Sequence, residues 1–237
     1  MRRVVLVLGL ATSCAAPGGA AWSGELASWG TLRAVLRDGE DQARVTLAEV
    51  ARDDVYALGA LAELAGEITI VDGDVWITRG DPETPATTCG SPGDAAAALL
   101  FACEVRAWRA FPIEHDIAPD ELDAFVERCA LRAGLDTTRP FPFLVEGRLT
   151  DLALHVVAGE CPLRARARGA STRAFELERA RLDGRLLGIY APDSAGVVCP
   201  HGSRTHVHAL VEQPAPLTGH VERCGIATGS ILRLPAE

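Results

Sequence analysis

Apolar runs that are broken by turn-forming residues dominate the first half of the chain. Within residues 55–78, two such runs flank the dipeptide Asp72-Gly73, which is typical of a tight hairpin turn, so the pattern predicts strands here. Upstream, Thr46 and Glu49 have the spacing of a capping box and predict the start of a short helix. Residues 80–95 are rich in Pro, Thr and Gly and are expected to form a loop.

The pattern in the middle of the chain predicts one strand and one helix. Residues 99–113 form a nearly continuous apolar segment that we expect to be a single strand. A helix should begin at Pro119, followed by acidic residues that suit its dipole, and end at Gly134. The apolar face of this helix consists of Leu122, Phe125, Val126 and Cys129.

The pattern after Pro140 is entirely that of β-strands. We expect one hairpin that turns at Glu146-Gly147, a second that turns at Asp183-Gly184, and then strands near residues 205–211 and 230–235. The chain is therefore predicted to be a β-rich α+β protein. Residues 31–138 would form a mixed or antiparallel N-terminal sheet with the helix, and residues 139–237 a C-terminal antiparallel β-barrel or sandwich.

The first residues have the pattern of an export signal. Arg2 and Arg3 precede an apolar run that is too short to span a bilayer, and small residues then lead to Cys14. Two alternatives follow: a lipoprotein signal whose Cys14 becomes lipidated, or an ordinary cleaved signal peptide over residues 1–21. Both predict an exported protein of the periplasm or cell envelope, with residues 22–30 as a tether and with membrane attachment only through a lipid on Cys14.

The chain contains seven cysteines, an odd number for an exported protein. If Cys14 carries a lipid or is removed, six remain, which suits three disulfides in an oxidising compartment. The preferred pairs are Cys89–Cys103, Cys129–Cys161 and Cys199–Cys224. No two cysteines have the C-x-x-C spacing of a thiolate zinc site.

The charge of the chain excludes several classes of function. A net charge of −9 argues against nucleic acids and anionic membrane surfaces as partners. All 23 basic residues are arginines, so neither Schiff-base chemistry nor a phosphate-binding loop lysine is available. No organic cofactor is expected, and any decarboxylation would depend on a metal.

The richest chemical signal lies between Thr205 and His220. His206 and His208 are two residues apart, so on a strand their imidazoles point to the same face. A turn-like segment then leads to His220, which can approach as a third ligand. Three imidazoles around Zn²⁺ or another divalent metal, with coordination positions left open, are typical of a catalytic site. The alternative interpretation is an ordinary polar strand face.

Several stretches together resemble the acetolactate decarboxylase family. GALAELAGEITIVDGDVW is similar to a Leu-x-Gly-Glu segment of that family, and FPFLVEGRLTDLALHVVAGECPLRARARG is similar to its central hairpin with a following arginine. GRLLGIYAPDSAGV resembles a Gly-rich strand of the family, and THVHALVEQPAPLTGH resembles its His-x-His…Gly-His metal motif. The resemblance extends from about Trp29 to Pro235.

The resemblance implies specific roles for residues of this chain. It places the zinc ligands at His206, His208 and His220, an active-site glutamate at Glu67, and an active-site arginine at Arg166, with Arg168 as the fallback. It also implies decarboxylation of 2-acetolactate, a small keto acid, to acetoin, and a homodimer. His155, which lies in an apolar strand, is expected to be a hydrogen-bonded structural residue.

The C-terminal end of the sequence departs from the family pattern, and two other interpretations of the histidines stay open. The family carries a second glutamate on a tail beyond its Leu-Arg-Leu-Pro segment, whereas the given sequence ends at Glu237. We therefore expect either that another acid replaces it or that the activity is weak, altered or lost. The rivals are a cupin-like metal site that uses Glu212 as a ligand, and a non-catalytic protein of the cell envelope that binds a metal or small acid.

Overall fold

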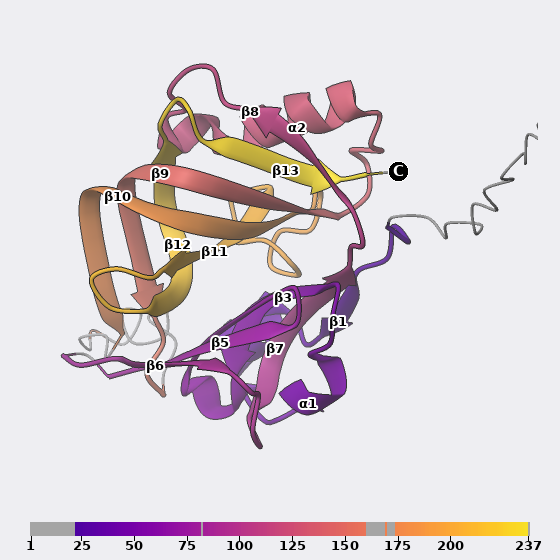
Figure 1. The fold of residues 1–237 in the computed structure, drawn as a ribbon. Coiled ribbons are helices and arrows are strands. Elements are labelled where there is room, and N and C mark those ends of the chain that lie inside the picture. The colour runs from indigo at the N-terminus through magenta and orange to yellow at the C-terminus, as the bar shows by residue number, and fades with distance from the viewer. Residues whose placement is uncertain (1–21, 82, 160–168, 170–173, 237) are drawn as a thin grey trace, which may run out of the picture.

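A computed structural model describes residues 22–81, 83–159, 169 and 174–236 of the chain. The described part consists of two antiparallel sheets that lie one above the other (Figure 1). The N-terminal sheet has the order β1-β7-β3-β4-β5-β6, with β2 also paired to β7. Its strands are β1 (Ala27–Trp29), β2 (Val45–Thr46), β3 (Val55–Leu61), β4 (Gly66–Val71), β5 (Asp74–Arg79), β6 (Ala86–Gly90) and β7 (Ala96–Glu104).

The C-terminal sheet forms the barrel that the sequence predicts. Its order is β10-β11-β12-β9-β13-β8, and β9 also pairs with β10, so that the pairings of β10, β11, β12 and β9 close into a ring. Its strands are β8 (Trp108–Pro112), β9 (Phe141–Val156), β10 (Phe175–Tyr190), β11 (Thr205–Val211), β12 (Leu217–Ile226) and β13 (Ile231–Pro235). The helical segments are η1 (Arg33–Asp38), α1 (Leu47–Val50), η2 (Ala62–Leu64), η3 (Pro119–Glu121) and α2 (Leu122–Ala133).

Local signals account for several of these elements. The backbone N–H and hydroxyl of Thr46 both donate to the Glu49 carboxylate, which confirms the capping box of α1. Asp72 and Gly73 both have positive φ, of 53° and 80°, and join β4 to β5 in the predicted hairpin. Helix α2 ends at Gly134 in the left-handed conformation, as expected.

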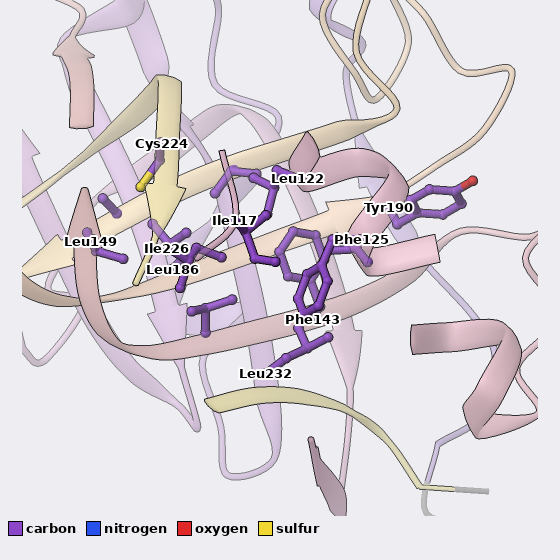
Figure 2. Close-up of a cluster of buried hydrophobic side chains, with 14 of the residues drawn as sticks. Ile117, Leu122, Phe125, Phe143, Leu149, Leu186, Tyr190, Cys224, Ile226 and Leu232 are labelled. Atoms are coloured by element: carbon purple, nitrogen blue, oxygen red, sulfur yellow. The ribbon is translucent and has the colours of Figure 1, made fainter. Parts of the chain in front are cut away.

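Three groups of buried side chains fill the described part. The first lies inside the barrel and includes the apolar face of α2, with Phe125, Phe143 and Ile226 among its members (Figure 2). The second fills the space between the two sheets, and the third lies on the far face of the N-terminal sheet, where α1 covers it. Because side chains alternate along a strand, β4 gives Ile68 and Ile70 to the far face and directs Glu67, Thr69 and Val71 toward the barrel.

Two expectations for residues 80–113 are wrong. Residues 86–90 form the edge strand β6 rather than a loop, and its mostly exposed side chains explain why no apolar pattern announces it. The segment 99–113 is not one strand, because β7 belongs to the N-terminal sheet and β8 pairs with β13 in the barrel. Glu104 and Arg106, ion-paired at 2.6 Å, mark the point where the chain leaves the first sheet.

Neither of the expected hairpins at Glu146-Gly147 and Asp183-Gly184 exists. Strands β9 and β10 instead run unbroken through these positions and pair with each other, with Gly147 directly opposite Gly184. Both strands curve around the barrel (Figure 1). At Gly147 a Cβ would lie 2.4 Å from the Ser230 hydroxyl oxygen, so glycine here permits a close approach inside a strand rather than a chain reversal.

Two segments lie at the limits of the sheets. Residues 27–29, expected in a tether, pair with β7 as strand β1. The chain passes from the sheet to the barrel between Glu104 and Trp108, ahead of the expected boundary at 138–139. The expected signal over 1–21, including Cys14, lies outside the described residues. Within the described part, no helix has the length and apolar character needed to cross a membrane.

The expected disulfides are absent among the described cysteines, since Cys89, Cys103, Cys129, Cys199 and Cys224 are free thiols. Cys89 and Cys103 lie on β6 and β7, which β5, β4 and β3 separate, a span of roughly 19 Å at the usual strand spacing. Cys199 and Cys224 belong to different buried groups, the one between the sheets and the one inside the barrel. Cys161, the expected partner of Cys129, lies outside the described residues.

Candidate metal centre

Three imidazoles converge on the face of the barrel that meets the N-terminal sheet. His206 and His208 are two residues apart on β11, so their side chains share this face. His220 of β12 lies directly opposite His208 in the strand register. One ring nitrogen from each of the three lies within 4.8 Å of the others. The ring centroids are 5.4 Å apart for His206 and His208, 4.9 Å for His206 and His220, and 5.8 Å for His208 and His220. The three histidines that the sequence singles out therefore lie together, and their role as metal ligands stays a prediction.

The group is buried between the two sheets. His206 and His208 are 2% and 1% exposed, and the ring of Phe101 from β7 contacts His206 edge-on. Nδ1 of His206 lies 2.8 Å from the carbonyl oxygen of Val198, in the loop that follows β10. If Nδ1 carries the proton and donates it there, Nε2 presents its lone pair to the other two rings.

Burial keeps these imidazoles neutral. It lowers the pKa of His206 to about 4, against the smaller opposing effect of the Val198 hydrogen bond. It also lowers the pKa of His208 and His220 well below the usual value, and the charges of neighbouring histidines lower both further. A divalent metal binds the neutral imidazole, so the protonation state and the spacing of the three rings both fit a metal with open coordination positions.

Glu67 lies beside the three histidines, where the resemblance placed it. It projects from β4 toward the barrel, is 3% exposed, and its Oε2 lies 3.6 Å from Nε2 of His208. The backbone N–H of Val157 donates to its Oε1 at 3.3 Å. Burial raises the pKa of Glu67 to about 7, although the charge of His155 and the Val157 hydrogen bond act in the opposite direction.

His155 is hydrogen-bonded, as expected, but the sequence reasoning did not predict that it lies beside the three histidines. It lies opposite His220 in the pairing of β9 with β12, with ring centroids 5.0 Å apart. Its Nδ1 lies 2.8 Å from Oε1 of Glu222, and its side chain is 16% exposed, so it lies closer to solvent than His206 or His208. Burial by itself would lower the pKa of His155, but the Glu222 hydrogen bond and the charge of Glu67 raise it overall. The sequence around His155, a lone histidine in an apolar strand, does not indicate that its ring lies next to His220.

The remaining sequence candidates are not part of the described site. Glu212, the fourth ligand of a cupin-like interpretation, is an exposed residue in an ion pair with Arg185 at 3.1 Å and does not belong to the group of three histidines. Arg166 and its fallback Arg168 lie outside the described residues, as does Glu237.

Comparisons with solved structures show the fold. A protein of unknown function from Staphylococcus aureus, similar to alpha-acetolactate decarboxylase, superposes with a TM-score of 0.69 at 16% identity, covering 88% of this chain and 84% of that one. The acetolactate decarboxylase of Bacillus subtilis subspecies spizizenii gives a TM-score of 0.68 at 15% identity, covering 90% and 86% of the two chains. That of Bacillus subtilis strain 168 gives 0.64 at 15% identity, with the same two coverages.

Sequence comparisons give the family. A search of curated proteins finds no significant match. The family model described as alpha-acetolactate decarboxylase matches residues 29–233, which include the three histidines, Glu67 and His155. This match spans most of the chain and both sheets. On that evidence, the chain belongs to the alpha-acetolactate decarboxylase family.

Proposed function

We propose that this protein decarboxylates 2-acetolactate, or a closely related 2-hydroxy-3-keto acid, to acetoin at a divalent metal, with zinc as the first candidate. One observation carries the proposal: three neutral imidazoles, two of them fully buried, place one nitrogen each within 4.8 Å of the others beside a buried carboxyl group, in a chain of the alpha-acetolactate decarboxylase family. His206, His208 and His220 would hold the metal. Once bound, the metal would supply a Lewis acid that stabilises the negative charge left on the substrate when CO₂ departs.

Glu67 is the proposed proton donor. When the carbon–carbon bond to the carboxylate breaks, its electron pair stays on the substrate, and a proton must be added to the carbon that carried the CO₂. Burial raises the pKa of Glu67 and so favours its protonated form, whereas the positive charge of a bound metal would act in the opposite direction. Glu67 is assigned the proton transfer because of its position, as the buried carboxyl group beside His208. Its Oε2 lies beside His208 Nε2, so a proton on this oxygen is held where the substrate would bind.

His155 is proposed to contact the bound acid at the entrance of the site. It lies next to His220 and closer to solvent than the other two rings, and its Nδ1 is engaged by Glu222. This leaves Nε2 as the ring nitrogen that can meet an oxygen of the substrate. Glu222 would thereby act as a positioning residue for His155. Arg166 stays a proposed partner of the substrate carboxylate on the basis of the family resemblance alone.

The decisive experiment measures metal content and acetoin together. Purified protein should contain about one zinc per chain and release acetoin from racemic acetolactate, and removal of the metal with a chelator should abolish release until zinc is restored. One bound zinc without acetoin, under any condition of substrate and pH, would overturn the enzymatic proposal and leave the binding-protein alternative. Absence of any bound metal would overturn both.

A further inference from the structure

A chain of buried hydroxyl groups connects the N-terminal sheet to His208. Thr69 of β4 places its Oγ1 3.1 Å from Nδ1 of His208, and the same oxygen lies 2.6 Å from Oγ1 of Thr218 on β12. Both threonines are fully buried, at 0% exposed. The two contacts cross the boundary between the sheets, because Thr69 belongs to the N-terminal sheet whereas Thr218 and His208 belong to the barrel.

The hydroxyl pair can fix which nitrogen of His208 faces the metal position. A neutral imidazole carries one N–H and one lone pair, and the partner of one nitrogen decides the role of the other. If Nδ1–H donates to Thr69, and Thr69 in turn donates to Thr218, the lone pair is held on Nε2. That nitrogen is the one 3.6 Å from Glu67. The backbone of Ile68, the residue before Thr69, also hydrogen-bonds His208. With no hydroxyl at position 69, the ring keeps that backbone partner but loses its side-chain tether to the opposite sheet and to Thr218.

We propose that Thr69, supported by Thr218, is a positioning residue that sets the orientation and the metal-binding nitrogen of His208, so that the N-terminal sheet forms part of the metal centre. This inference rests on the proposed function. Outer hydrogen-bond partners of metal-binding histidines typically change metal affinity by about 10- to 100-fold. Thr69 should contribute an effect of this size although it does not touch the metal.

A matched control lies on the neighbouring strand. Thr78 of β5 is also 0% exposed, and its Oγ1 accepts a hydrogen bond from the backbone N–H of Thr218 at 2.9 Å. It also meets Oγ1 of Thr87 at 2.9 Å. Its hydroxyl does not contact a histidine among the described residues. Thr78→Val therefore removes a buried hydroxyl from the same region without removing the partner of His208.

The test titrates the metal-free protein with Co²⁺, whose visible absorption reports ligand geometry, and with Zn²⁺ in competition. Thr69→Val should weaken zinc binding roughly 10- to 100-fold and alter the Co²⁺ spectrum, Thr69→Ser should restore both, and Thr218→Val should shift both in the same direction as Thr69→Val. Thr78→Val should lower the thermal midpoint while it keeps the wild-type spectrum and affinity.

The outcomes separate this inference from the proposed function. If the wild-type protein binds neither metal, the metal centre itself is wrong and the inference fails with it. If the wild type binds metal and folded Thr69→Val matches it in spectrum and affinity, only the inference is overturned. Should Thr69→Val fail to fold, the comparison of Thr218→Val with Thr78→Val decides: equal metal affinities and spectra in these two variants would overturn the inference.

Discussion

His155 of β9 lies directly opposite His220 of β12, and their ring centroids are 5.0 Å apart. The pairing of two strands far apart in the sequence thus adds a fourth imidazole to the region of the proposed metal. Glu222 fixes this ring from the solvent side through Nδ1. His155 is therefore the polar group through which an incoming acid is expected to reach the buried histidines.

His155→Ala should raise KM for acetolactate about tenfold, since the loss of one hydrogen bond to a substrate costs roughly 1 to 1.5 kcal/mol. Zinc content should stay at the wild-type level. Glu222→Gln should have a smaller effect in the same direction, because the amide oxygen can still accept from Nδ1. Steady-state kinetics and elemental analysis measure both quantities.

The matched control for Glu222→Gln is Glu178→Gln. Glu178 is an exposed acid bound to Arg223 at 3.3 Å rather than to His155, so its loss should leave KM unchanged. A wild-type KM in His155→Ala would show that the ring does not touch the substrate.

His208→Ala should remove the metal. The ring supplies one of three proposed ligands, so its loss should exceed the roughly 10- to 100-fold effect typical of an outer-shell partner. Glu212→Gln, which breaks only a surface ion pair with Arg185, should retain full zinc content. Zinc-to-protein ratios after gel filtration measure the outcome, and zinc loss in Glu212→Gln would revive the cupin-like interpretation.

Glu67→Gln should lower kcat by roughly 10²- to 10⁴-fold, the usual contribution of a general acid. The amide nearly matches the carboxyl group in shape and can still accept from Val157 N–H, so the fold and the zinc content should be preserved. Single-turnover acetoin release with the zinc-loaded variant gives the rate. A kcat within a factor of a few of the wild type would exclude Glu67 as the proton donor.

Glu127 of α2 should stabilise the helix on the barrel at neutral pH and lose this effect in acid. Its carboxylate accepts hydrogen bonds from Arg204 at 2.7 Å and from the Tyr190 hydroxyl at 2.9 Å. The Arg204 hydrogen bond, followed by that of Tyr190, lowers the pKa of Glu127 below its usual 4.5. Because the folded pKa lies below the unfolded one, the stabilisation is complete above the unfolded pKa and is lost as the pH falls through the folded pKa.

Glu127→Gln should therefore reduce the free energy of unfolding more at pH 7 than at about pH 3. Both partners of the ion pair are partly exposed, so the difference at pH 7 should be about 0.2 to 1 kcal/mol. Urea unfolding of the wild type and the variant at the two pH values measures it. A difference of equal size at both pH values would show that packing, rather than the charge of Glu127, is responsible.

The sequence by itself determined the elements whose signals are local. The two-residue spacing of His206 and His208 places both rings on one strand face, whatever that strand packs against. The capping box at Thr46 and the glycine after α2 act through backbone geometry within a few residues. The order of the motifs along the chain was also enough to indicate the family, which the family model confirms.

Only the tertiary structure decided which distant residues meet. Strand pairing placed His155 beside His220, and packing of the two sheets placed Glu67 and Thr69 against His208. It also decided that Gly147 and Gly184 lie within long strands, because a glycine that permits a bend or a close approach has the same local signature as one that permits a turn. Register and sheet-to-sheet contacts depend on the burial of whole faces, which short-range pattern does not encode.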